Sequence, residues 1–149
     1  MKRTDYAIVH KLKELLKSEE PKVKWFIKNS KTGPDNQSML HCAAKHYRYD
    51  PCRVLIDDIE YEPVKLTKSL KTPLHTMCMS ETFKQDKELY DPKFEKCFNL
   101  LVSKGVDCNS VDDTNRTALH YAVMSKNIKA VESLCELRNI KTSVSFLCI

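Results

Sequence analysis

The sequence predicts an all-α fold, a solenoid of stacked antiparallel helix pairs joined by short connecting fingers. A short motif occurs three times, at residues 38–41, 72–75 and 117–120. Each copy is followed by two stretches in which apolar residues recur at helical spacing. Neither stretch has an apolar face wide enough to fold alone, so each pair has to stack on its neighbours.

The clearest helix pair lies at residues 114–136. Thr117 opens its first helix, because a hydroxyl there can accept a backbone N–H that would otherwise lack a partner. A polar break at 125–127 ends this helix. The second helix brings four side chains to one face, namely Ile128, Val131, Leu134 and Cys135.

The repeated motif combines a hydroxyl N-cap, a leucine and a histidine. Pro73 fits the first helical position, which has no hydrogen bond to lose. The first two copies start 34 residues apart and the next two 45 apart, and removing a 12-residue insertion at about 80–91 leaves 33. The signature residues are Ser38, Leu40, His41, Thr72, Pro73, Leu74, His75, Thr117, Leu119 and His120.

This pattern resembles the ankyrin repeat, which has a period of about 33 residues and the signature T-P-L-H-x-A. The resemblance is strong for 114–136, good for 70–113 and fair for 36–60. It implies repeats at 35–69, 70–113 and 114–139, after a divergent N-terminal capping helix pair at 1–34 and before a tail at 140–149. It also implies that His41, His75 and His120 join hydrogen bonds that tie adjacent repeats together.

The N-terminal pair carries the excess of positive charge. Residues 1–33 hold nine Lys or Arg and four acids, which accounts for the whole net charge of +5. An amphipathic helix is predicted at 4–17. A second short helix is predicted from about residue 23 to the turn at 32–35, and we expect Trp25 and Phe26 in it to be buried. The lysines either solvate the end of the stack or bind anionic lipid or nucleic acid.

Other parts of the chain give weaker signals. A helix is predicted at 50–58 with Pro51 in its first turn, whereas 60–70 is open to an extended or partly helical form. The insertion at 80–91 is either a solvated loop or a binding loop. With only Gly33 and Gly105 in the chain, the remaining turns should deviate from the family's geometry. In the tail, Val144, Phe146 and Leu147 could fold back onto the last pair.

The sequence shows no pattern typical of an enzyme, a metal site or a cofactor site. Seven cysteines without a C-x-x-C predict free thiols, and we expect Cys78, Cys97 and Cys135 to be buried. His75 and Cys78 share a helix face, but no further ligands occur at zinc spacing, and two isolated glycines make no phosphate loop. With neither a signal peptide nor a long apolar run, the chain is predicted to be cytoplasmic or nuclear.

The resemblance implies a non-enzymatic module that binds another protein, with no small-molecule substrate. We expect contact through the insertion and the polar turn at 109–116, which has no evident core role. Two contexts fit: the cytosolic ankyrin array of a cation channel, similar to insect A-type transient receptor potential channels, or a free-standing adaptor similar to inhibitors of Rel-type transcription factors. The possible contact residues are Tyr47, Arg48, Met79, Phe83, Tyr90, Asp113, Asn115, Arg116, Lys126 and Asn127.

Overall fold

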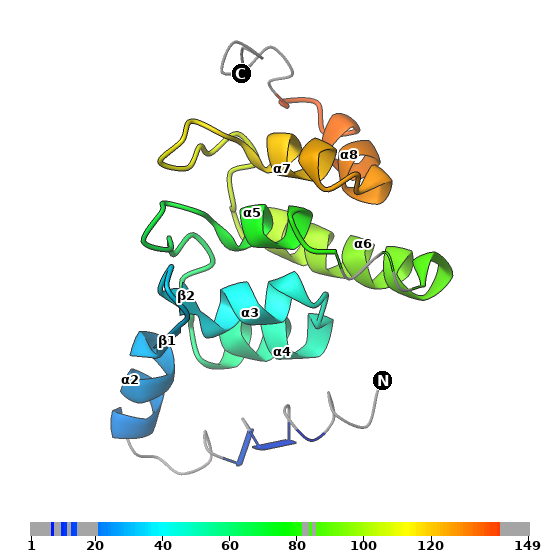
Figure 1. The fold of residues 1–149 in the computed structure, drawn as a ribbon. Helices are drawn as coiled ribbons and strands as arrows, with labels where there is room; N and C mark the ends of the chain where they lie inside the picture. Colours follow the sequence, from blue (N-terminus) through cyan, green and yellow to red (C-terminus); the bar gives the residue numbers. More distant parts are fainter. Residues whose placement is uncertain are drawn as a thin grey trace.

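The computed structural model describes residues 7, 10, 11, 13, 14, 21–81, 84 and 86–140. Three helix pairs lie one above another, with the connecting loops on one side (Figure 1). The inner helices α3 (Met39–Lys45), α5 (Pro73–Cys78) and α7 (Ala118–Met124) contact one another in chain order. Among the outer helices, α6 (Lys87–Ser103) contacts both α4 (Tyr49–Arg53) and α8 (Ile128–Cys135). The prediction of an all-α stack of helix pairs is confirmed.

The inner helices begin where the hydroxyl motif predicts. Ser38, Thr72 and Thr117 have extended backbone conformations immediately before the first helical residue. The Ser38 and Thr72 hydroxyls each accept the backbone N–H three residues later, at 3.4 Å. Because these N–H groups have no partner inside the helix, each cap stabilises a helix of only six or seven residues.

The segment before the first pair contains α2 (Pro21–Asn29) and a two-stranded antiparallel ribbon of β1 (Lys31–Thr32) and β2 (Gln37–Ser38). The prediction that Trp25 and Phe26 are buried is wrong, because they are 66% and 68% exposed. Among the α2 side chains that the structure describes, Ile27 enters the core, and Trp25 lies about 160° around the helix axis from it. The helix predicted at 4–17 lies mostly outside the described residues.

The second helix of the first pair is α4, which continues directly into a π-helical stretch, η1 (Val54–Asp58). Together they match the helix predicted at 50–58, and Pro51 lies in the first turn of α4 as expected. The following connection, residues 60–70, is neither helix nor strand and contains turns at 63–64 and 68–69. Tyr61 and Thr67 anchor this connection, because both are buried.

The insertion is only partly a loop. Asp86 accepts the N–H of Leu89 at 3.2 Å and caps α6, so residues 87–91 belong to this 17-residue helix. Tyr90 is buried, with its ring centroid 6.3 Å from that of Tyr47. The expectation of a loop through residue 91 is therefore wrong, because the second half of the insertion lengthens an outer helix.

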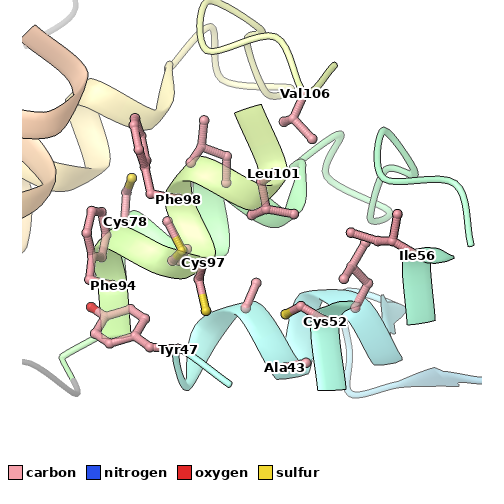
Figure 2. Close-up of a cluster of buried hydrophobic side chains, with 14 of the residues drawn as sticks. Ala43, Tyr47, Cys52, Ile56, Cys78, Phe94, Cys97, Phe98, Leu101 and Val106 are labelled. Carbon is pink, nitrogen blue, oxygen red and sulfur yellow. The ribbon is translucent and has the colours of Figure 1, made fainter. Parts of the chain in front are cut away.

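One continuous core joins the three pairs, and Figure 2 shows its part between the first two pairs. Tyr47 packs edge-on against Phe94 at 5.3 Å between ring centroids, and Phe94 stacks on Phe98. Cys78 and Cys97 are buried, as expected, and Cys52 is buried too. Cys135 is exposed, contrary to our expectation. Cys135 is the last residue of the short helix α8, whose buried residues are Ala130, Ser133 and Leu134.

Most of the tight turns use a left-handed residue that is not glycine. Besides Gly33 and Gly105, a positive φ occurs at Asn36, Tyr47, Glu60, Leu70, Asn115 and Lys126. The scarcity of glycine therefore does not remove left-handed turns from this chain. It places in them side chains that carry a conformational cost of about 1–2 kcal/mol each, less for asparagine.

Candidate functional site

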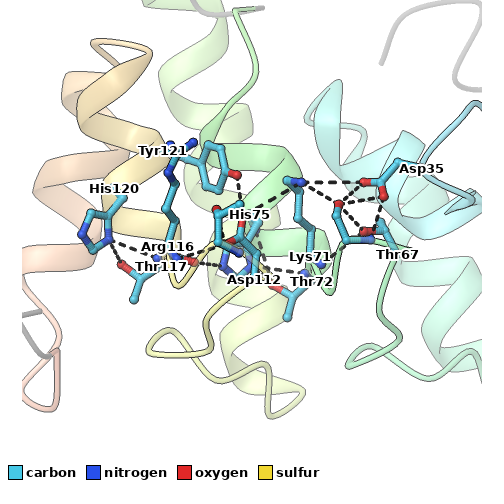
Figure 3. Close-up of polar contacts among 12 residues, drawn as sticks. Asp35, Thr67, Lys71, Thr72, His75, Asp112, Arg116, Thr117, His120 and Tyr121 are labelled. Carbon is cyan, nitrogen blue, oxygen red and sulfur yellow. Dashed lines mark hydrogen bonds and ion pairs between the residues drawn. The ribbon is translucent and has the colours of Figure 1, made fainter. Parts of the chain in front are cut away.

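Two histidines, His41 and His75, join the helix pairs at the base of the fingers, and Figure 3 shows His75 with its polar neighbours. His41 Nε2 lies 3.0 Å from the Lys71 carbonyl oxygen, and His75 Nε2 lies 3.0 Å from that of Arg116. Each carbonyl belongs to the residue directly before the next N-cap. The geometry agrees with the linking role that the family resemblance implies for these two histidines.

The partners of each ring determine its tautomer. The backbone N–H of Ser38 donates to His41 Nδ1 at 3.4 Å, and that of Thr72 donates to His75 Nδ1 at 3.1 Å. Nδ1 is therefore the acceptor in both rings, and Nε2–H donates to the carbonyl of the next pair. Thr117 N–H donates to His120 Nδ1 in the same way, at 3.1 Å.

Burial favours the neutral form of these rings. Desolvation lowers the pKa of His41 to about 4, despite the hydrogen bond to Lys71 that acts in the opposite direction. Desolvation also lowers the pKa of His75. A proton added to Nδ1 would remove the acceptor of the N-cap N–H, so the charged form is incompatible with this arrangement.

A buried carboxylate organises the third finger, the loop at residues 105–117. Asp112 accepts hydrogen bonds from the Tyr121 hydroxyl at 2.5 Å and from the N–H groups of Thr114 and Arg116 at 2.9 Å. Burial opposes ionisation of Asp112, but these hydrogen bonds outweigh it and lower its pKa to about 2. The expectation that the turn at 109–116 has no core role is therefore wrong for Asp112.

The fingers are also bonded to one another. In the second finger, residues 60–72, the Ser69 N–H donates to the Asp35 carboxylate at 2.8 Å, and the Lys68 N–H donates to the Asp35 carbonyl at 2.8 Å. The Asp113 N–H of the third finger donates to the Ser69 carbonyl at 3.1 Å. Lys71 Nζ lies between two carboxylates, 3.8 Å from Asp35 and 4.0 Å from Asp112. These bonds fix the three fingers in one row.

Equivalent residues of the three fingers share an unusual backbone conformation. Asn36, Leu70 and Asn115 each precede an N-cap by two residues, and their φ angles are 52°, 60° and 61°. Asparagine tolerates this left-handed region, whereas leucine does not favour it. Leu70 is nevertheless 47% exposed, so its side chain gains little from packing in return for the backbone cost.

Leu70 belongs to a set of exposed side chains on the second and third fingers. Val64 and Leu66 of the second finger and Val111 of the third are exposed apolar residues like Leu70. Exposed charged residues accompany them along the same two fingers. We call this set the finger surface, which consists of Val64, Leu66, Lys68, Leu70, Val111, Asp113, Asn115 and Arg116.

The structure separates the contact residues predicted from sequence into groups. Asp113, Asn115 and Arg116 are exposed on the third finger, and Met79 and Lys126 are exposed after α5 and α7. Arg48 is half-buried, and Phe83 lies outside the described residues. Three of the residues are in the core and are therefore unavailable on the surface, namely Tyr47, Tyr90 and Asn127.

Asn127 illustrates why a polar residue can be hidden. Its side-chain oxygen accepts the Ala130 N–H at 3.1 Å and caps α8, while its amide donates to the Tyr47 hydroxyl at 3.2 Å. Sequence reasoning also missed Val64, Leu66, Leu70 and Val111. The available signal was Leu70, which stands where the other two fingers have asparagine.

The described part of the chain contains neither a metal-binding cluster nor a membrane-spanning helix. No group of three or more His, Cys, Asp or Glu side chains within it is placed to hold a metal ion. None of the helices in the same ranges combines the length and apolar character needed to cross a bilayer.

The C-terminal part of the chain matches a known protein family. Residues 92–145 match a family model described as ankyrin repeats (3 copies). The matched range starts within α6 and includes α7 and α8. In the earlier pairs α3–α4 and α5–α6, the N-cap N–H donates to Nδ1 of the histidine three residues later, as it does at α7.

Proposed function

Because the chain contains ankyrin repeats, we propose that it is a non-enzymatic protein-binding module whose finger surface contacts the partner. The observation that carries this proposal is Leu70, an exposed leucine in a left-handed conformation. Backbone strain of this kind persists where the surroundings enforce it and concentrates at functional positions. The hydrogen bonds of Ser69 and Asp113 supply that enforcement.

The chemistry of the finger surface matches that of protein interfaces. Interfaces combine an apolar centre with a polar rim, and a few central residues carry most of the binding energy. Leu70, Leu66 and Val64 form the apolar part, and Lys68, Asp113 and Arg116 add charges of both signs. Since the fingers are bonded in a row, the surface is largely ordered before binding, which lowers the entropic cost of association.

Leu70→Asn tests this assignment directly, because asparagine occupies the equivalent position in the other two fingers. The substitution suits the backbone, so folding should be preserved while the exposed apolar side chain is lost. In a lysate pull-down with quantitative mass spectrometry, we expect proteins captured by the wild type to be reduced at least about tenfold for Leu70→Asn. Leu89→Asn, at an exposed leucine on α6, is the matched control and should capture them normally.

Two narrower functions are proposed as alternatives within this class. The chain is either the cytosolic ankyrin part of a larger protein such as a cation channel, or a free-standing adaptor that inhibits a Rel-type transcription factor. Co-expression separates them: an inhibitor should retain a tagged Rel-type factor in one compartment, and Leu70→Asn should release it. No change in the distribution of the factor would exclude the inhibitor.

A second candidate function is binding of an anionic surface by α2. The exposure of Trp25 and Phe26 beside Lys22 and Lys24 favours it, since aromatic and basic side chains together are typical of membrane-interface segments. Co-sedimentation with phosphatidylserine vesicles should then weaken steeply with salt and with Lys22→Gln and Lys24→Gln. Equal binding to neutral vesicles, or none at low salt, would rule it out.

A further inference from the structure

Tyr47 contacts all three helix pairs at the end of the helices opposite the fingers. It stands in the turn between α3 and α4 and therefore belongs to the first pair. Its ring lies edge-on to Tyr90 and Phe94 of α6, with distances of 6.3 Å and 5.3 Å between ring centroids. Its hydroxyl accepts a hydrogen bond at 3.2 Å from the side-chain amide of Asn127, the N-cap of α8 in the third pair. One side chain thus reaches across the second pair to a residue 80 positions away in the chain.

The surroundings of Asn127 and Tyr47 define this bond. The side-chain oxygen of Asn127 accepts the N–H of Ala130 at 3.1 Å, so its amide nitrogen is the atom that faces Tyr47. Both side chains are buried, since Tyr47 is 2% exposed and Asn127 is 1% exposed. Burial raises the pKa of Tyr47 to about 12, against the opposing effect of hydrogen bonds with Ser80 and Asn127. The hydroxyl therefore stays neutral, and its removal would leave the buried Asn127 amide without this acceptor.

The long connection in the second pair leaves room for this contact. Residues 46–48 and 125–127 join the helices of the first and third pairs, whereas the second pair uses residues 79–86. The start of α6 accordingly projects beyond α4 (Figure 1). Tyr47 and Asn127 therefore meet across the place where a short turn of the second pair would otherwise lie.

We propose that Tyr47 and Asn127 form a clamp that couples the first helix pair directly to the third. In a solenoid each unit contacts only its neighbours, so a terminal unit can open while the others stay folded. Here the opening of either terminal pair has to break the bond between Tyr47 and Asn127. The three pairs therefore open together, as one cooperative unit. The clamp lies at the helix ends away from the fingers, so this inference and the finger surface can fail independently.

Native-state hydrogen exchange tests the clamp, because it measures the opening of each helix separately. In the wild type, backbone amides of α3, α5 and α8 should share one opening, with opening constants that agree within about threefold. Tyr47→Phe keeps the ring and removes the hydroxyl, so the amides of α3 and α8 should then exchange at least about tenfold faster than those of α5. Tyr49→Phe makes the same deletion at a half-buried tyrosine of α4. As the matched control, it should leave the three helices exchanging together.

Asn127→Ser removes the same bond from the third pair. Serine can still cap α8, but it lacks the amide that donates to Tyr47, so this variant should also separate the terminal helices from α5. Combining Tyr47→Phe with Asn127→Ser should separate them no further than either change alone, because both remove one bond.

Three results would overturn the proposal. Wild-type amides of α8 that already exchange about tenfold faster than those of α5 would show that the terminal pairs open alone. If the three helices still exchange together in Tyr47→Phe, the bond to Asn127 is not what couples them. Additive effects in the double variant would mean that the two side chains act separately.

Discussion

The buried imidazole rings make the stability of the protein depend on pH. In an unfolded chain the pKa of histidine is about 6.5, whereas burial lowers that of His41 to about 4. Between these values the unfolded chain binds more protons, so the free energy of unfolding falls as the pH falls. The stabilisation that comes from the neutral His41 ring is fully present above pH 6.5 and is lost progressively as the pH falls toward 4.

The free energy of unfolding measured in urea should therefore be about 2 kcal/mol lower at pH 5 than at pH 7.5 because of His41 alone. His75 should lower it further. Asp112 does not contribute in this window, because its stabilisation is lost only below about pH 3.8. Equal stability at both pH values would show that the two rings accept protons in the folded state.

The left-handed turns allow a second prediction at this scale. Lys126 is exposed, with a φ of 58°, and glycine adopts that conformation without steric cost. Lys126→Gly should raise the free energy of unfolding by about 0.5–1 kcal/mol in urea titration. Lys96→Gly, at an exposed position inside α6, should lower it by about 1 kcal/mol. Destabilisation by both would show that the turn carries no strain.

At the scale of the elements, α6 tests whether the insertion belongs to the fold. Tyr90→Ala removes a ring packed on Tyr47 and should cost about 3 kcal/mol by urea unfolding. Leu89→Ala, one residue earlier and exposed, should cost less than about 0.5 kcal/mol. A neutral effect of Tyr90→Ala would mean that residues 87–91 are not part of the core.

The elements also show what local sequence can and cannot reveal. The hydroxyl caps and Pro73 stabilise the first turn of a helix through contacts within that turn. The starts of the inner helices could therefore be predicted from the local sequence. The start of α6 could not, because the packing of Tyr90 on Tyr47 joins residues 43 positions apart. Trp25 and Phe26 were misjudged for a similar reason, since the buried side of a short helix depends on its neighbour. Leu70 was missed because its exposure depends on how the fingers are bonded.

At the scale of the whole molecule, the protection of thiols should follow global unfolding. A hydrogen bond with the Cys97 thiol, together with burial, raises the pKa of Cys52, and burial raises that of Cys78. Because the thiolate is the reactive form, these two cysteines should react only when the stack opens. A thiol reagent should count seven cysteines in denaturant, with Cys135 fast in the native state. Rapid native labelling of Cys78 would contradict a single continuous core.

The histidine bonds run in one direction along the chain, since His41 and His75 each donate from Nε2–H to the pair that follows. Each contact between two successive helix pairs therefore contains one buried imidazole N–H proton. That proton is shielded from exchange with water only while the next pair is in place. In NMR spectra the two protons report on the two contacts separately. If the stack unfolds first at its C-terminal end, the His75 Nε2–H resonance should be lost first, and if it unfolds first at its N-terminal end, the His41 resonance should be lost first. The order in which these two resonances disappear as the temperature rises therefore shows at which end of the stack unfolding begins.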